Sequence, residues 1–499
     1  MTEHEFDLAG RRARLAPSRA ALYWRGRWLN YAELDLRARR LAARLQQIGL
    51  GKGERVSILA LNHVAHIDLI LAAPKLGFIY APFNYRLSPP EQAQLAQYVR
   101  PGLLLHDASH GELARATGAP LLPLERYEDW LAAAGEPVLQ PAALTAEDPA
   151  MMLFTGGSTG LPKGALLPYR QLRANAGHTA ASWQLTAEDC AIQATPAFHA
   201  AVNVLTTPLL SIGGRVVLQE SFDAAEYLRL LGAGEATLMF LVPGMYQMLA
   251  EHPEFARADF FRVRFAIAGG APCPEPVRAA YAARGIHFRL GYGLTEAGVN
   301  CFTITDVEAA AHPDSVGRPI GDMQAVVRRA DGTPAAVAEV GELTLAGPQL
   351  SLGYYQRPDE TAASFRGGWL WTGDLARRDR DGLFYICGRR KEMYISGGEN
   401  VYPIEVETAL YEHPAIAECA VLGVPDERWG ETGLAAIVRK PGEKLGAAEL
   451  QAWLRTRLAG YKRPRHLLFL DALPKSGAGK ILKPEIRRQY MQQPGATGT

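Results

Sequence analysis

Short aliphatic runs alternate with amphipathic helical segments along roughly the first 290 residues, and this alternation restricts the fold more than any other feature. Leu34, Ala38, Leu41 and Leu45 recur every three or four residues, which is the spacing of one helix face. The strand-like runs are 55–60, 214–218, 237–242 and 265–268, and the other helix-like segments are 224–231 and 276–284. Alternating strands and helices predict an α/β fold with layered, mainly parallel sheets.

The pattern changes after about residue 320. Two strand-like runs, 326–329 and 341–345, are separated by an Asp331-Gly332 turn, which predicts antiparallel pairing. The last hundred residues have their own α+β pattern, with helices at 404–411 and 448–458 around a strand at 419–424. A chain of 499 residues is too long for one ordinary core. We therefore predict two domains, 1–389 and 390–499.

Composition excludes several classes of protein. The formal net charge is +1, so no overall field favours nucleic acid as a partner. The longest apolar stretch, 69–83, is interrupted by Pro74, Lys75 and Pro82, which is typical of a core segment and not of an integral membrane segment. The N-terminus lacks the apolar centre of a signal peptide. Scattered cysteines without a CxxC pair indicate free thiols in a reducing compartment, and together these features predict a cytoplasmic enzyme. The cysteines are Cys190, Cys273, Cys301, Cys387 and Cys419.

A glycine-rich stretch, Thr155–Gly164, follows the apolar run 151–154. Glycines let backbone amides converge on an anion and a lysine adds a full charge, so the stretch is typical of a phosphate-binding loop. It is not a Walker A loop, because Pro162 stands where glycine is required and Gly164 where serine or threonine is required. A flexible linker is the alternative, but the strand-like runs on both sides argue against it.

Further motifs follow in a fixed order over essentially the whole chain. They are Pro196-Ala197-Phe198-His199, Gly269-Gly270-Ala271-Pro272, Gly291-Tyr292-Gly293-Leu294-Thr295-Glu296, Trp371-Thr372-Gly373-Asp374-Leu375, Gly388-Arg389-Arg390-Lys391-Glu392, Ser396-Gly397-Gly398-Glu399-Asn400-Val401-Tyr402-Pro403 and Pro474-Lys475-Ser476-Gly477-Ala478-Gly479-Lys480-Ile481. With the glycine-rich loop, this series resembles the acyl-adenylate-forming superfamily, the AMP-binding acyl-CoA synthetases. Within it, the chain is most similar to fatty-acid–CoA ligases and to feruloyl- or cinnamoyl-CoA synthetases.

The resemblance implies a fold and a reaction. The large N-terminal domain would add a distorted antiparallel β-barrel to its layered sheets, and the small α+β C-terminal domain would be mobile. The enzyme would be an ATP-dependent, AMP-forming acyl-CoA ligase that uses ATP, Mg²⁺ and coenzyme A. It would convert a monocarboxylic acid, fatty or cinnamate-like, into an acyl-adenylate and then into a CoA thioester. Transfer of the acyl group to a carrier-protein thiol is one alternative, and a catalytically silent binding protein is another.

The resemblance also implies catalytic roles. Lys480 would bridge the carboxylate and the α-phosphate, and Thr295 would donate to that phosphate. Glu296 would be the Mg²⁺ ligand, because a carboxylate beside a triphosphate is repulsive unless it holds a cation. His199 would lie beside the acyl carboxylate. The alternatives are that Lys480 is a solvated surface lysine and that His199 has only a structural role, which are the commoner roles of these residue types.

The nucleotide would be held by two sets of residues. The phosphate-binding set is Thr155, Gly156, Gly157, Ser158, Thr159, Gly160 and Lys163, and the AMP-binding set is Gly270, Ala271, Pro272, Gly291, Tyr292, Gly293, Asp374, Ile386 and Arg389. Tyr292 would pack against the adenine, while Asp374 and Arg389 would meet the ribose. Gly156 departs from the family, which usually has serine there, and we expect altered nucleotide affinity or loop mobility.

The remaining assignments concern the hinge, coenzyme A and the acid. Lys391 would be the hinge, and Gly397 and Gly398 would line a channel for the pantetheine arm of CoA, although a simple charge run and a simple turn are the alternatives. The acyl pocket would include Val202, Val242, Gly269, Leu294 and Val299. No lysine or arginine in these segments could pair a second carboxylate, so an acid with an uncharged tail is expected. The oligomeric state stays open, with a homodimer among the options.

Overall fold

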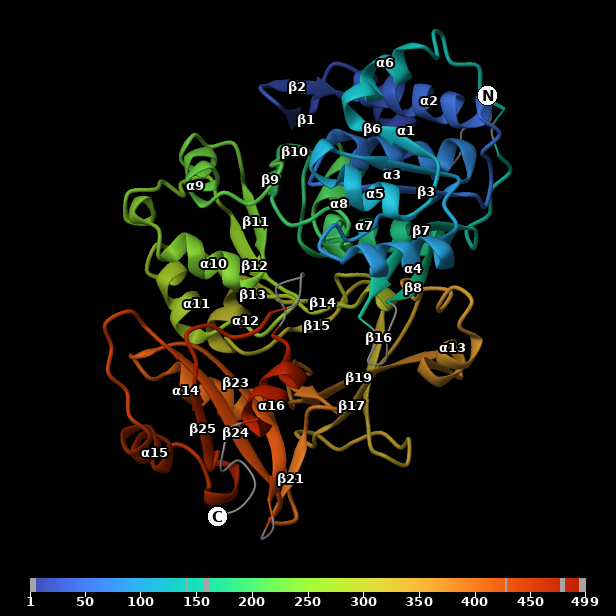
Figure 1. Cartoon of the computed structure of the whole chain (residues 1–499). Coiled ribbons are helices and arrows are strands. Elements are labelled where there is room, and N and C mark those ends of the chain that lie inside the picture. Colours follow the sequence, from blue (N-terminus) through green and yellow to red (C-terminus); the bar gives the residue numbers. More distant parts are fainter. Residues whose placement is uncertain (1–5, 141, 157–161, 427–428, 476–480, 493–499) are drawn as a thin grey trace.

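The computed structural model describes residues 6–140, 142–156, 162–426, 429–475 and 481–492. Figure 1 shows two α/β layered units side by side, an antiparallel sheet below them and a C-terminal lobe next to that sheet. The arrangement confirms the predicted α/β fold with a large N-terminal part and a separate α+β unit. Within these ranges, no helix combines the length and the apolar character that crossing a membrane requires.

The first α/β unit is built on a six-stranded sheet with the order β6-β5-β3-β4-β7-β8. Its strands are β3 (Arg55–Leu59), β4 (Ile79–Tyr80), β5 (Leu103–His106), β6 (Leu121–Pro123), β7 (Pro149–Thr155) and β8 (Lys163–Pro168). All neighbours are parallel except β7 and β8, which form an antiparallel pair at one edge. The glycine-rich loop connects these two strands.

The second sheet is seven-stranded, with the order β13-β12-β11-β9-β10-β1-β2. Its strands are β1 (Ala20–Trp24), β2 (Arg27–Asn30), β9 (Cys190–Gln193), β10 (Arg215–Leu218), β11 (Leu238–Leu241), β12 (Phe265–Ala268) and β13 (Phe288–Leu290). Only the β1–β2 hairpin is antiparallel. The carboxyl ends of β12 and β13 therefore open at the same edge, which is where parallel sheets place their ligands.

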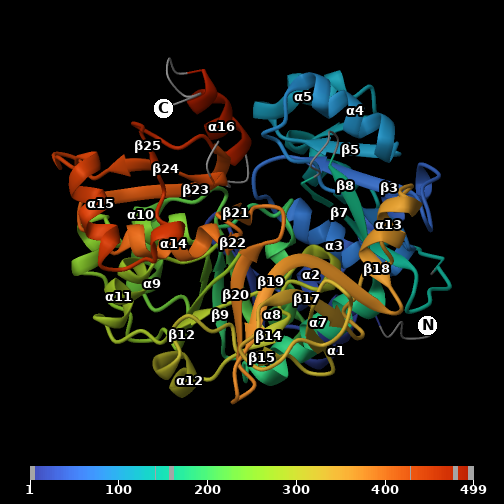
Figure 2. The ribbon, with the colours of Figure 1, turned by 90° about the horizontal axis from the view of Figure 1, so that it is seen from below.

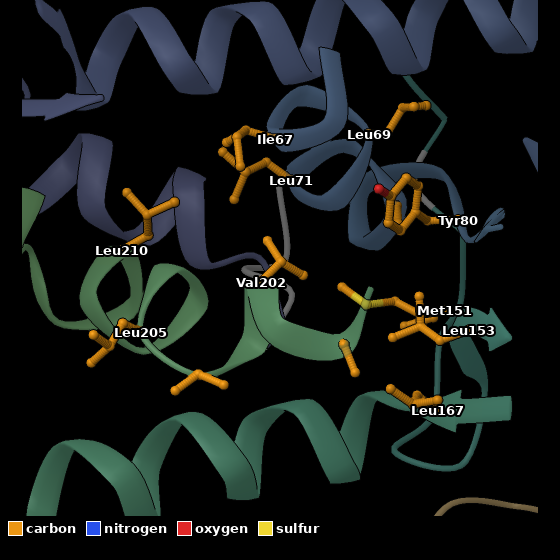
Figure 3. Close-up of a cluster of buried hydrophobic side chains, with 14 of the residues drawn as sticks. Ile67, Leu69, Leu71, Tyr80, Met151, Leu153, Leu167, Val202, Leu205 and Leu210 are labelled. Carbon is orange, nitrogen blue, oxygen red and sulfur yellow. The ribbon is translucent and has the colours of Figure 1, made fainter. Parts of the chain in front are cut away.

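Helices cover these sheets. They are α1 (Leu8–Leu15), α2 (Tyr31–Gln47), α3 (Val64–Leu76), α4 (Pro89–Val99), α5 (Gly111–Ala116), α6 (Tyr127–Ala132), α7 (Tyr169–Ser182), α8 (Thr206–Ile212), α9 (Ala224–Gly232), α10 (Pro243–Ala250), α11 (Glu275–Ala282) and α12 (Asp306–Ala311). In α2, an Asn30–Glu33 capping box fixes the start, and the predicted stripe from Leu34 to Leu45 is buried. Figure 3 shows part of the core, where Ile67 and Leu71 of α3 face Val202 and Leu210.

The antiparallel sheet has the order β16-β17-β19-β18, with β20 paired to β19. It contains β16 (Gln324–Arg328), β17 (Gly341–Ala346), β18 (Phe365–Arg366), β19 (Trp369–Arg378) and β20 (Phe384–Arg389), and α13 (Pro358–Ser364) lies beside it. A bridge between Gly317 and Phe384 joins it to the short pair β14 (Phe302–Thr303) and β15 (Arg318–Pro319). The result is a half-barrel in the place of the expected distorted barrel, and the predicted 326–345 hairpin is part of it.

The C-terminal lobe has a sheet of its own, β22-β21-β24-β23 with β25 on β24 (Figures 1 and 2). Its elements are β21 (Tyr394–Ser396), β22 (Glu399–Val401), α14 (Pro403–Tyr411), β23 (Ile416–Asp426), β24 (Gly430–Arg439), α15 (Ala447–Arg455), β25 (His466–Phe469) and α16 (Lys483–Met491). Alternate residues of β23 enter two different cores, one under α14 and α15 and one under α16. The predicted domain boundary at 389/390 falls at the end of β20, and both this boundary and the mobility of the lobe stay predictions.

Candidate active site

The phosphate-binding candidates lie on the β7–β8 hairpin. Thr155 ends β7 and pairs with Lys163, the first residue of β8. Gly156 is exposed, and a Cβ built on it would meet no atom within 4 Å. The rest of the predicted loop, Gly157, Ser158, Thr159 and Gly160, lies outside the described residues, as does Lys480.

Glu296, the predicted metal ligand, is held by two hydroxyl groups. It lies in the 3₁₀ turn Thr295–Ala297 and is buried. Its Oε1 accepts hydrogen bonds from the Tyr354 hydroxyl at 2.9 Å and from Thr155 Oγ1 at 3.3 Å. Burial, reinforced by the charge of Glu296, raises the pKa of Tyr354 well above its usual range, so this phenol stays a donor.

The carboxylate of Glu296 suits a hard cation shared with phosphate oxygens. Among the described residues, no group of three or more His, Cys, Asp or Glu side chains could hold a metal ion by itself. Mg²⁺ is commonly bound by one or two carboxylates together with substrate phosphates and water, so a single buried glutamate fits it.

Lys163, the predicted phosphate-binding lysine, is the first residue of β8. Its Nζ forms an ion pair with Glu360 of α13 and lies 4.9 Å from the centroid of the Tyr354 ring. Tyr354 therefore touches both Lys163 and Glu296, two residues that the motifs assigned to the same triphosphate. The motif series did not single out Tyr354 or Glu360.

Two predicted AMP-binding residues, Tyr292 and Arg389, contact the carboxylate of a third, Asp374. Asp374 is buried on β19, and its Oδ2 accepts a 2.6 Å hydrogen bond from the Tyr292 hydroxyl. Arg389, its register partner on β20, places Nε 3.0 Å from Asp374 Oδ1. Ile386 lies on the same strand, opposite Ala376. Tyr292 thus reaches Asp374 directly, in addition to its expected place beside the adenine.

The other AMP-binding candidates lie where β12 and β13 end. Gly270 has a φ of +83°, which favours glycine, and Ala271 and Pro272 after it are exposed. Gly291 follows β13 and donates from its N–H to the carbonyl of Ala268 at 2.7 Å. A Cβ on Gly293 would lie 2.1 Å from the Val299 carbonyl oxygen, so this position admits no side chain.

The acyl-pocket candidates divide into two groups. Val242, Leu294 and Val299 are partly buried, and Gly269 packs so closely on Phe240 that a Cβ there would lie 3.3 Å from the ring. Val202 is fully buried among the core side chains of Figure 3, so a place for it in the pocket wall stays a prediction.

His199 is placed by the turn that it begins. It is half-buried as the N-cap of the 3₁₀ turn Ala200–Asn203, and its Nδ1 accepts from the N–H of Ala201. The preceding Phe198 packs edge-on against Tyr85.

Three buried polar residues on one face of α7, which no sequence motif indicated, include two that hold loops of the candidate site, the Thr295 turn and the turn that ends at Asn203. Gln171, Asn175 and Thr179 are spaced four residues apart and are all buried. Gln171 Nε2 donates to the Thr295 carbonyl at 2.9 Å, and Asn175 Nδ2 donates to the Asn203 carbonyl at 2.8 Å. The i, i+4, i+8 spacing was a visible signal, but polar residues at such positions are normally taken for a solvent-exposed face.

The hinge candidate, Lys391, lies beside a residue that forms an ion pair. Lys391 itself is exposed, whereas its neighbour Arg390 pairs with the buried carboxylate of Glu342 at 3.0 Å. Gly397 and Gly398 have φ values of +61° and +85°. A Cβ on Gly397 would lie 2.4 Å from the Trp429 ring, so a glycine is required there.

Comparison with known proteins identifies the family. The model of the AMP-binding enzyme family matches residues 10–355, and that of the AMP-binding enzyme C-terminal domain matches 405–480. The chain belongs to the AMP-binding enzyme family.

Relatives match along almost the entire chain. A feruloyl-CoA synthase of Amycolatopsis is 40% identical over 96% of this chain and 98% of its own. The long-chain-fatty-acid–CoA ligase FadD13 of Mycobacterium tuberculosis is 33% identical over 93% of both chains. The structure of the o-succinylbenzoate CoA synthetase MenE of Bacillus subtilis with its acyl-adenylate intermediate has a TM-score of 0.87 at 29% identity, covering 96% of this chain and 98% of that one. These comparisons confirm the predicted AMP-forming acyl-CoA ligase and favour it over transfer to a carrier protein.

Proposed function

We propose that this family member activates an aromatic monocarboxylic acid of the cinnamate type, with ATP, Mg²⁺ and coenzyme A as its other reactants. The observation that carries the choice is the contact between Gly269 and the Phe240 ring. Because Gly269 carries no side chain, the Phe240 ring packs directly against its backbone, and a flat, apolar ring at this edge of the sheet would suit a planar acid. The feruloyl-CoA synthase of Amycolatopsis, which acts on such an acid, supports the same choice.

The first half-reaction joins the carboxylate to the α-phosphorus of ATP and releases pyrophosphate. Lys163 and Thr155 would hold the leaving phosphates, and the Thr295 hydroxyl would donate to the α-phosphate. Glu296 would hold Mg²⁺, whose charge offsets that of the phosphate oxygens when it is bound. Lys480 would pair with the carboxylate and the α-phosphate together, which aligns the two reacting groups.

Asp374 would accept hydrogen bonds from the ribose hydroxyls. Its carboxylate is already oriented by Tyr292 and Arg389, so little reorganisation is needed when the nucleotide binds. In the second half-reaction, the CoA thiol attacks the acyl carbon and AMP leaves. The small C-terminal lobe would rotate about Lys391 between the two steps and bring Gly397 and Gly398 to the pantetheine arm.

We place this reaction in the cytoplasm. The five cysteines are all free, and only Cys387 is less than fully buried, which fits a reducing compartment.

A substrate panel tests the proposal. The protein is incubated with ATP and Mg²⁺ and with cinnamic, ferulic, benzoic, octanoic or palmitic acid, with and without CoA. We expect the fastest pyrophosphate release and a CoA thioester with the cinnamic acids. Faster turnover of the fatty acids would contradict the aromatic assignment, and pyrophosphate release without a CoA product would favour a carrier-protein acceptor.

Lys480→Ala tests the catalytic assignment. We expect acyl-adenylate formation to fall by orders of magnitude, because the charge that aligns the two anions is removed. Thioester formation from supplied acyl-AMP should be spared. Equal losses in both half-reactions would refute the role of Lys480, and the exposed Lys440→Ala serves as the control.

A further inference from the structure

One short segment holds two side chains of the proposed triphosphate site. Tyr354 donates to Glu296 at 2.9 Å, and Glu360, six residues later, forms the ion pair with Lys163. The two contacts come from the same side of the β7–β8 hairpin, because the backbone of residues 352–355 runs along β8. One predicted phosphate ligand, Lys163, and the predicted Mg²⁺ ligand, Glu296, are therefore each bound by a side chain of this segment.

The position of Glu360 is tightly defined. The N–H of Tyr355 donates to the Gly164 carbonyl at 2.8 Å, which fixes the segment to β8 next to Lys163. The N–H of Tyr354 donates to Thr361 Oγ1 at 2.9 Å, which fixes the first turn of α13 to that segment. Glu360 lies in this first turn, where a carboxylate is favourable because of the helix dipole.

The Lys163–Glu360 pair is only partly open to solvent. The side chains are 27% and 33% exposed. An ammonium group in such a place needs an anionic partner, and either a carboxylate or a phosphate oxygen can fill this role. The Glu360 carboxylate and a phosphate oxygen compete for Lys163, because their negative charges repel each other at short range.

Glu360 also has a second cation within reach. Arg357 Nη1 lies 3.5 Å from Glu360 Oε1, on the side away from the Oε2 atom that meets Lys163. If a phosphate oxygen replaces Glu360 as the partner of Lys163, the Glu360 carboxylate still has Arg357 as a positive neighbour. The exchange of partners therefore leaves no charge without compensation.

We propose that Glu360 is the resting counter-ion of Lys163 and sets the affinity for ATP by competing with the triphosphate. The inference rests on the proposed role of Lys163 in phosphate binding. It makes Glu360 a determinant of nucleotide affinity that touches no substrate atom itself. The same ion pair holds the Lys163 side chain over the Tyr354 ring.

The test compares Glu360→Gln with Asp359→Asn. Both variants remove one negative charge from the first turn of α13, but Asp359 is exposed and Lys163 pairs with Glu360. The dissociation constant of ATP with Mg²⁺ is measured by calorimetry without an acid substrate. We expect Glu360→Gln to tighten ATP binding by about threefold to tenfold, the range of a partly exposed ion pair, and Asp359→Asn to change it much less. Equal effects of the two variants, or weaker binding by Glu360→Gln, would overturn the proposal.

A double variant separates this inference from the function on which it rests. In a Lys163→Ala background, the effect of Glu360→Gln should disappear, and a persisting gain would show that Glu360 acts by another route. If Lys163→Ala alone leaves ATP binding unchanged, the role of Lys163 in phosphate binding fails. If Lys163→Ala weakens binding while Glu360→Gln is silent, only the counter-ion role fails. Thermal melting of each variant confirms that it is folded.

Discussion

Gly156 stands at the start of the proposed phosphate loop, at the position where the family resemblance leads us to expect serine. Its backbone needs no positive φ, and no atom lies within 4 Å of a Cβ built there. Gly156→Ser is therefore expected to fit without strain and to add one donor for a phosphate oxygen. The KM for ATP should fall by about twofold to fivefold, which corresponds to the lower part of the net contribution of one hydrogen bond. Pyrophosphate release at varied ATP concentration measures this KM. The control is Gly156→Ala, which adds a side chain without a hydrogen-bond donor. An equal change of KM in the two variants would show that the hydroxyl is dispensable.

Gly293 illustrates the opposite case among the glycines. Its Cα faces the Val299 carbonyl so closely that any side chain would displace the backbone of the 293–299 loop. The motif therefore keeps a glycine here for packing, whereas at Gly156 the space for a side chain is open.

Helix α7 contacts two separate loops of the candidate site, the turn at Thr295 and the turn that ends at Asn203. Gln171→Ala should remove the support of the Thr295 carbonyl and leave it without that donor, which costs about 1–3 kcal/mol of unfolding free energy. Because Thr295 is next to Glu296, we also expect kcat for adenylation to fall by roughly tenfold with a smaller change in KM for ATP. The exposed Gln97→Ala on α4 is the matched control. A loss of stability with unchanged kcat would restrict α7 to a purely structural role.

The elements that could be predicted from the sequence are those defined by local patterns. The stripe of α2 appears where the helical period places it, because one face of the helix is buried. The apolar runs of β3 and β12 appear where they were predicted, because nearly every residue of these strands is buried. The stripe of α7 could not be predicted, since the partner of Gln171 lies 124 positions away in the chain. Likewise, the motifs indicated Tyr292, Asp374 and Arg389 but not their contacts. The Asp374–Arg389 ion pair depends on the register of β19 and β20, and the bond from Tyr292 to Asp374 joins residues 82 positions apart.

Acid should destabilise the whole molecule before its carboxylates are protonated. Burial lowers the pKa of His66 to about 4 and, with the charge of His66 added, that of His63 to about 3. In the unfolded chain both titrate near 6.5, so between about pH 6.5 and 4 the unfolded state binds more protons than the folded state. Stability therefore falls as the pH falls through this window, by about 1.4 kcal/mol per pH unit for each histidine.

Urea unfolding at several pH values measures this slope. His66→Gln should flatten it by one proton, because the substituted side chain does not titrate. The exposed Gln97→Ala, which removes no titratable group, should leave the slope unchanged. An unaltered slope in His66→Gln would contradict the assignment.

The proposed rotation between half-reactions involves both domains of the chain. Lys391→Pro fixes φ at the proposed hinge, so we expect acyl-adenylate formation to stay within about twofold while thioester formation is slowed by orders of magnitude. Lys391→Ala, which keeps the backbone free, should spare both steps. Pyrophosphate release and CoA-thioester formation report the two steps separately, and slower adenylation with an intact thioester step would reverse the assignment.

Among the described residues, the C-terminal lobe covers both faces of its own sheet with α14, α15 and α16, and the buried side chains of its two cores all come from residue 394 onward. Because its cores are self-contained, we expect the lobe to remain folded when the backbone is cut near Lys391. A protease that nicks the exposed residues around Lys391 should leave two fragments that each keep a cooperative melting transition. The enzyme could then be produced as two polypeptides, and the activity regained on mixing would measure how strongly the lobe binds to the rest of the protein.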